Sequence, residues 1–475
     1  MDKIEKKPEG EISNSAELDD AAIADETPSR LSGFVFFLLC GMPVFSAIAF
    51  GAVDTWAFGL LSLFSGFIVI FWLTDAFLKK ELRLNLSLLQ IPLLGLILIG
   101  LIQLLPLRRA AVSGELLSVP AVSSLSLASY QTRLAVAQLI IYFIFLAVAL
   151  VFINSQKRLQ KIVLVIIIFG SMMAFFGILQ RLANPEAIYG LRPAGQAIPF
   201  ASFINQHHFA AFMEMTIGLT LAVLLGKSTK KDKRFLLIIA VILMGIAIVL
   251  TGSRGGMLSL LGVVGFIIIS NLLNKQKDEH STATNENNYR RNFALIAGGL
   301  ALILGLFGAV ILLGGDESLM RGIGLQTGQQ DISNGRGHFW QIALKIFFDY
   351  PILGAGLDSF GTVFTRYDTW NGVYRLEQAH NDYLQILADA GILGFVCVAA
   401  FIYLLFKQSL QTIGKTTDLF RRDVAMGALV GCFGILLHSF FDFPLRTPSN
   451  AFFFLILTVL ATVSINYPKL HRRRK

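Results

Sequence analysis

The feature that most constrains this chain is a series of long apolar segments that recur along almost its whole length. A bilayer core about 30 Å thick requires roughly 20 apolar residues in a helix. Of the 475 residues, 55% are hydrophobic and only 15% are charged, which excludes an ordinary soluble domain. The segments that meet the requirement, or nearly meet it, are residues 31–53, 56–78, 84–106, 134–154, 159–182, 203–226, 235–252, 255–273, 293–314, 384–406, 423–442 and 447–467. The sequence therefore predicts an all-α polytopic membrane protein with about 12 transmembrane helices.

The basic residues predict how these helices are oriented. Because the number of predicted spans is even, both termini lie on one side, and the basic tail at residues 468–475 marks that side as cytoplasmic. Short basic clusters recur in the loops assigned to the same side. We therefore interpret the net charge of +9 as a topology signal and expect no nucleic-acid partner. The polar, mostly acidic residues 1–30 are predicted to form a disordered cytoplasmic tail.

One outer loop is much longer than the others. Nine predicted helices in residues 31–314 precede this loop at residues 315–383, and three more follow in residues 384–467. Loops of this length are usually functional or disordered. Residues 338–350 favour order, because polar and apolar side chains fall on opposite faces of a helix there. We therefore expect the loop to carry an amphipathic helix at the membrane interface.

Two residues at the outer boundary are candidates for chemistry. Arg254 lies in a Thr-Gly-Ser-Arg-Gly-Gly turn between two spans, where an ionisable group is costly and is expected to bind a ligand anion or a buried carboxylate. His380 opens the helix after the large loop, a position that suits a proton acceptor, although a lone histidine is more often structural. The basic residues assigned to the outer side are all Arg except Lys345, and Arg suits bidentate phosphate binding.

The stretch that begins at His380 resembles the signature of bacterial O-antigen ligases. That signature is His, then Asn, Ser or Gln, nine residues, Gly, two residues, and finally Gly, Thr or Tyr. His380, Asn381, Gly391 and Gly394 fit it throughout. Four further runs resemble the broader O-antigen ligase and polymerase superfamily across about residues 200 to 467. They are Gly-Ser-Arg-Gly-Gly at Arg254, Gly-Arg-Gly-His-Phe-Trp at Arg336, Pro-Ile-Leu-Gly-Ala-Gly at Pro351 and Asp-Phe-Pro-Leu at Asp442.

The resemblance implies a membrane glycosyltransferase with a fold related to the multispan (GT-C-like) glycosyltransferases. It would move a glycan from an undecaprenyl diphosphate carrier to an acceptor hydroxyl on the periplasmic face of the bacterial inner membrane, with inversion. Arg254 and Arg336 would stabilise the diphosphate leaving group, and His380 would take the proton from the acceptor. No Asp-x-Asp motif stands in an outer loop, so we expect metal independence and no cofactor. Residues 315–383 would then form a periplasmic catalytic loop.

Further residues are candidates for substrate binding. The run that opens with Asn205 and contains His208 resembles a run seen in many superfamily members, but Asn205 serves equally well as a helix cap. Asp382 lies two residues after His380 and is proposed to orient its imidazole. The remaining candidates for contact with sugar, diphosphate or acceptor are Asn381, Arg366, Arg375 and Arg446. Alternatively, the three arginines are solvated residues at the membrane interface.

Several alternatives remain open. O-antigen ligases carry Leu at the fourth position after the loop arginine, whereas Trp340 follows Arg336 here. The acceptor is therefore a lipid A-core glycan, another surface glycan or protein, or a second repeat unit, as in a polymerase. A lipid-linked glycan transporter would use ionisable residues near the bilayer midplane, for which Glu214 and Asp389 are the candidates. An intramembrane protease would pair Ser253 with a histidine.

Overall fold

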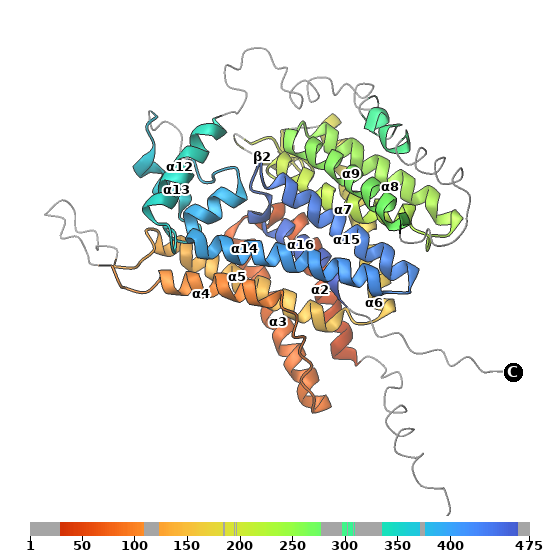
Figure 1. Cartoon of the computed structure of the whole chain (residues 1–475), viewed down its shortest axis with the longest axis horizontal. Helices are drawn as coiled ribbons and strands as arrows, with labels where there is room; N and C mark the ends of the chain where they lie inside the picture. The colour runs from red at the N-terminus through yellow and green to blue at the C-terminus, as the bar shows by residue number, and fades with distance from the viewer. Residues whose placement is uncertain are drawn as a thin grey trace, which may run out of the picture.

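The computed structural model describes residues 29–108, 123–183, 186–193, 195, 197–276, 297–301, 303–306, 308, 335–370 and 376–463. This part of the chain is mostly helical (Figure 1). A small antiparallel hairpin joins β1 (Ala187–Ile188) to β2 (Arg192–Pro193). The helices are α2 (Arg30–Ile48), η2 (Phe50–Ala52), α3 (Thr55–Lys79), α4 (Gln90–Gln103), α5 (Ser129–Phe152), α6 (Gln156–Ala183), α7 (Gln206–Leu225), α8 (Lys231–Leu250), α9 (Arg254–Gln276), α12 (Arg336–Asp349), α13 (Phe360–Tyr367), α14 (Asp382–Lys415), α15 (Leu419–His438), η3 (Pro444–Arg446) and α16 (Pro448–Thr462).

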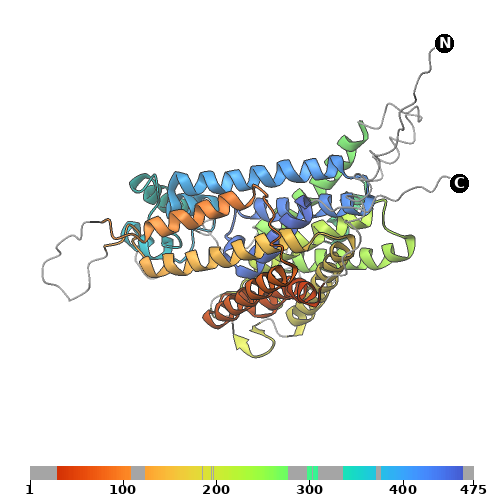
Figure 2. The same cartoon turned by 90° about the horizontal axis from the view of Figure 1, so that it is seen from below.

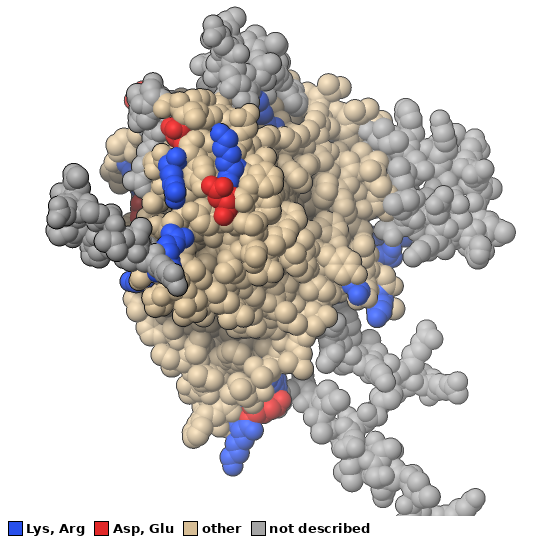
Figure 3. Space-filling model, turned by 60° about the vertical axis from the view of Figure 1, so that its left-hand side comes forward, with Lys and Arg blue, Asp and Glu red and all other residues tan. Residues whose placement is uncertain are grey.

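The long apolar helices confirm the predicted all-α polytopic membrane protein. Among the described residues, seven helices are long and apolar enough to cross a bilayer, namely α2, α3, α5, α6, α7, α8 and α14. The apolar helices α4 and α16 are shorter, and α15 begins with charged residues. Figure 3 shows one face of the molecule, which is mostly uncharged, with Lys, Arg, Asp and Glu in a few small groups. The count of 12 spans stays a prediction, since most of the ninth predicted span lies outside the described residues.

Helix α7 is the centre of the bundle and packs against α15, α8, α9, α6 and α16. Nearly all of its side chains are buried, as expected for a helix that is apolar all round. Glycines bring α7 and α15 into backbone contact. A Cβ on Gly218 of α7 would lie 2.8 Å from the amide nitrogen of Gly431, and one on Gly431 would lie 2.5 Å from the carbonyl oxygen of Met215. Small residues of this kind let membrane helices approach closely.

The helix predicted at residues 338–350 is present as α12. Its apolar side chains Ile342, Ala343 and Ile346 are buried, and they share one cluster with Phe360 of α13 and Ala388 of α14. The apolar face of α12 therefore packs on the protein itself. Figures 1 and 2 show α12 and α13 gathered at one end of α14.

Helix α14 is interrupted at Gly391, where φ is +63° and ψ is −163°. The interruption leaves the carbonyl groups of Ala388 and Asp389 without helical partners. The turn that follows α12 supplies them, because the amides of Ala355 and Gly356 donate to these carbonyls at 2.9 and 3.0 Å. The glycine of the His380 signature therefore serves to dock the turn at residues 351–356 onto α14.

We predict that Gly391→Ala destabilises the protein by roughly 1–3 kcal/mol, because alanine is strained at this positive φ. Its Cβ would also lie 2.4 Å from the carbonyl oxygen of Ile352. Gly414→Ala in the same helix is the matched control, since nothing lies within 4 Å of the position that its Cβ would take. Thermal unfolding in detergent measures both variants, and equal midpoints would contradict the role assigned to Gly391.

Candidate functional site

The carboxylate of Asp442 joins two of the predicted site residues. His380 Nδ1 lies 3.1 Å from Asp442 Oδ1, and Arg336 Nη2 lies 3.5 Å from Asp442 Oδ2. The Asp442 side chain is 1% exposed, whereas those of His380 and Arg336 are 26% and 21% exposed. A buried carboxylate thus stands behind an imidazole and a guanidinium that reach the surface.

Local backbone structure places His380 beside Asp442. His380 has a φ of +52°, an uncommon conformation for a residue other than glycine. The next residue, Asn381, caps α14 by accepting from the amides of Tyr383 and Leu384, each at 3.0 Å. Its side-chain amide also donates to the Phe440 carbonyl at 3.0 Å. Asn381 therefore ties the start of α14 to the turn after α15, and this turn carries Asp442.

The Asp442 carboxyl group has a strongly perturbed pKa. Burial by itself would raise this pKa, but the hydrogen bond and charge of His380, together with His207 and His208, hold it well below the usual range. The carboxylate is therefore ionised at neutral pH. Its stabilising contacts are fully present above the ordinary pKa of about 4 and are lost only as the pH falls through the lowered value.

The ring of Phe443 separates two histidines of the site. Its centroid lies 4.7 Å from that of His208 and 4.9 Å from that of His380, with the rings nearly perpendicular in both pairs. His208 is buried, and its Nδ1 lies 2.7 Å from the hydroxyl of Thr447. Asn205 accepts from the His207 amide at 2.8 Å and caps α7. The structure therefore shows the helix-capping contact predicted for Asn205, and its substrate-binding role stays a prediction.

The Arg254 turn packs against the same region. Arg254 opens α9, and the preceding Ser253 hydroxyl lies 2.8 Å from His207 Nδ1. A Cβ on Gly255 would lie 2.8 Å from the His438 ring and 3.4 Å from Cβ of Phe441, the neighbour of Asp442. Glycine is therefore required where the two turns meet. Arg254, Arg336 and His380, far apart in the chain, gather at one end of the bundle.

Ser253 and Glu214 have partners that bear on the alternative functions. The Ser253 side chain is fully buried, and its hydroxyl accepts from the amide of Gly256 at 3.1 Å, which caps α9. Glu214 lies 2.9 Å from His438 Nδ1, and both side chains are buried in the bundle. Sequence reasoning did not single out His438, because a histidine at the end of an apolar segment is commonly a packing residue.

Arg446 lies among three carboxylates. Its guanidinium contacts Asp358 and Asp389 at 2.7 Å each and Asp382 at 3.9 Å. Asp382 in turn accepts from the Ser439 hydroxyl at 3.0 Å and from the Leu445 amide at 3.3 Å. The carboxylate that contacts the His380 imidazole is therefore Asp442 rather than Asp382. The sequence signal for Asp442 was its place in the Asp-Phe-Pro-Leu run.

The other predicted arginines are less closely connected to Asp442. Arg366 is exposed on α13, and Arg375 lies outside the described residues. The same loop contains an aromatic group that the sequence did not single out. His338 stacks on Trp370 with ring centroids 4.2 Å apart, and its Nε2 lies 2.9 Å from Asp368. No group of three or more His, Cys, Asp or Glu side chains in the described part of the chain is arranged to hold a metal ion.

Comparison with known proteins supports the resemblance at the level of the family. A family model described as O-Antigen ligase matches residues 239–399, a range that contains Arg254, Arg336 and His380. No curated protein matches the chain.

We predict that Arg446→Met lowers stability by about 3 kcal/mol or more, because it leaves the fully buried Asp389 without its cation. Methionine keeps most of the side-chain volume. Arg366→Met, on the exposed surface of α13, is the control and should leave the unfolding midpoint nearly unchanged. If both variants unfold at the same temperature in detergent, Arg446 does not hold the carboxylates together.

Proposed function

We propose that this member of the O-antigen ligase superfamily moves a glycan from a polyprenyl diphosphate carrier to an acceptor hydroxyl. The superfamily consists of O-antigen ligase-type and polymerase-type glycosyltransferases. The observation that carries the specific proposal is the shared carboxylate of Asp442, which holds His380 and Arg336 together. One candidate base and one candidate anion-binding cation thus stand side by side.

In the proposed reaction, His380 is the general base. Its Nδ1–H donates to Asp442, which leaves Nε2 to accept the proton of the acceptor hydroxyl. The acceptor oxygen attacks the anomeric carbon while the bond from this carbon to the diphosphate oxygen breaks. The bonding electron pair leaves with the diphosphate, and a single displacement inverts the configuration. Asp442 also stabilises the imidazolium that forms.

The arginines act on the leaving group. Negative charge grows on the diphosphate as the glycosidic bond breaks, so fixed cations beside it stabilise the transition state. Arg336 and Arg254 are assigned this role, which requires no metal ion. Asn381, Asp382 and Arg446 position the site through the contacts that hold α14 to the turn after α15. Asn205 and His208 hold the start of α7 and the face of Phe443.

The placement in the cell follows from the charge pattern. Both termini are assigned to the cytoplasm and the Asp442 site to the periplasmic face of the inner membrane, with 12 spans in a GT-C-like arrangement. The acceptor is a lipid A-core glycan or another surface acceptor in a ligase. The second candidate is a polymerase that joins repeat units. It is favoured by Trp340, which stands at the position where ligases carry Leu. In a transporter, Glu214 and Asp389 would bind cargo or ions, but each has a protein partner.

Reconstitution tests the proposal directly. Purified protein is supplied with an undecaprenyl diphosphate-linked glycan in the presence of EDTA, with lipid A-core in one arm and only additional lipid-linked repeat units in the other. We predict that His380→Gln lowers turnover roughly 10² to 10⁴-fold, because general-base assistance is lost. His338→Gln is the matched control, since His338 also pairs with an aspartate. Unchanged turnover of the His380 variant would remove the base assignment.

We predict that Asp442→Asn lowers kcat at least tenfold, because an amide does not favour the Nδ1–H tautomer of His380. Asp442→Glu should restore part of the loss. Since the pKa of Asp442 is held well below its usual range, the wild-type carboxylate is ionised throughout pH 5–8, and the two proteins are compared at one pH within this range. Equal kcat values for Asp442→Asn and the wild type would show that the Asp442 charge is not required.

A further inference from the structure

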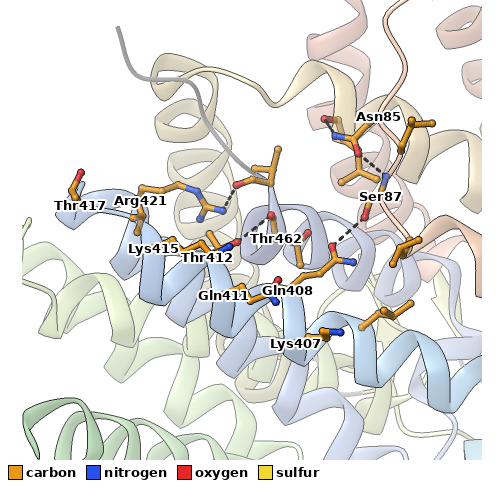
Figure 4. Close-up of a pocket in the computed structure, with 16 residues that line it drawn as sticks. Asn85, Ser87, Lys407, Gln408, Gln411, Thr412, Lys415, Thr417, Arg421 and Thr462 are labelled. Atoms are coloured by element: carbon orange, nitrogen blue, oxygen red, sulfur yellow. Dashed lines mark hydrogen bonds between the residues drawn. The ribbon is translucent and has the colours of Figure 1, made fainter. Parts of the chain in front are cut away.

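A cavity of about 820 Å³ lies beside the last turns of α14 (Figure 4), whereas His380 precedes the first turn of this helix. The first residue of α14 that lines the cavity, Leu404, lies 22 residues after Asp382, which corresponds to roughly 33 Å along the helix. Its walls come from the segment before α4, the last turns of α14, the start of α15 and the end of α16. None of the residues assigned to glycan transfer lines it.

The charged residues in the cavity wall all have the same sign. Lys407, Lys415 and Arg421 line the cavity, and no carboxylate of the described residues does. The four-residue spacing of Lys407, Gln411 and Lys415 places them along one face of α14. Arg421 donates to the carbonyls of Leu460 and Val463 at the end of α16. Neither lysine forms an ion pair within the described part of the chain, so both remain available to an anion.

Neutral hydrogen-bonding groups lie between the lysines. Gln408 and Thr412 of α14 contact the opposite walls, Gln408 through the Ser87 hydroxyl at 3.1 Å and Thr412 through the Thr462 carbonyl at 3.2 Å. Figure 4 shows these side chains on either side of the cavity, with Gln411 on the same helix. The wall therefore offers amide and hydroxyl groups beside two ammonium groups, a set that suits a phosphate.

The same cavity has apolar walls that are open to the outside. Leu86 and Leu88 line it and are 90% and 52% exposed, and Leu404 lies on α14. Exposed leucines beside lysines are typical of the boundary between hydrocarbon and headgroup, where a lysine stem lies along apolar surface and its ammonium group reaches the polar layer. The occupant that matches both walls has a phosphate and an acyl chain in one molecule.

We propose that this cavity binds an anionic phospholipid, with the phosphate between Lys407 and Lys415 and an acyl chain along Leu86 and Leu88. The binding is independent of the glycan-transfer proposal, because the two sites share no residue. It places a lipid contact at the meeting point of α14, α15 and α16, and the first two of these helices also lead to the Asp442 site.

The test uses the full chain in a neutral detergent and measures lipid retention by native mass spectrometry. We predict that phosphatidylglycerol is retained and phosphatidylcholine is not, and that Lys407→Gln/Lys415→Gln weakens phosphatidylglycerol binding roughly tenfold or more. Lys231→Gln/Lys233→Gln, which removes the same charge from the exposed start of α8, should bind as the wild type does. Lys407→Arg/Lys415→Arg changes the same two positions but keeps both positive charges, so it should retain binding. Loss of binding in the glutamine variant alone then reflects the lost charge rather than a failure to fold.

Three results would overturn the proposal. If Lys407→Gln/Lys415→Gln and Lys231→Gln/Lys233→Gln bind phosphatidylglycerol equally well, any loss of binding is a general effect of the protein's charge. Equal retention of phosphatidylcholine would show that the phosphate charge is not recognised. Competition by millimolar inorganic phosphate, at an ionic strength held constant, would show that the cavity recognises a free anion rather than a lipid.

Discussion

The pairing of the buried Asp442 carboxylate determines how the end of the bundle that carries His380 is assembled. Burying an ionised carboxylate is costly unless it has a charged or hydrogen-bonding partner. Asp442 lies directly after α15, so its partners must come from other parts of the chain. They come from the start of α12 and from the segment just before α14, which brings Arg336 and His380 to the same turn.

The same requirement explains two further buried charge pairs. Glu214 of α7 meets His438 of α15, and Asp389 of α14 meets Arg446 of η3. Each pair joins two elements at or near the end of the bundle where the glycine-rich turns lie. These two pairs thus hold elements that apolar packing alone would leave free to move. Below them, glycine contacts between α7 and α15 and the apolar surfaces of the remaining helices form the core.

The break in α14 links the core to the site. A continuous helix would satisfy its own carbonyls, but the positive φ of Gly391 transfers two of them to the turn at residues 351–356. This turn also holds Asp358 beside Arg446. A single helix therefore extends from the proposed transfer site at one end to the proposed lipid-binding cavity at the other, with its only non-helical backbone at Gly391.

The sequence by itself determined the membrane class, most helix positions and several of the residues that gather at one end, but not His438. Apolar length and helical periodicity are local properties, so the helix α12 and the capping option for Asn205 were predictable, although α4 is shorter and α14 longer than expected. Only the tertiary structure decided which charges meet. Asp442, not Asp382, contacts His380, and Arg446 turns toward three carboxylates. The physical reason is that an ion pair depends on how distant helices pack, and an apolar pattern specifies that a helix is buried without specifying its neighbour.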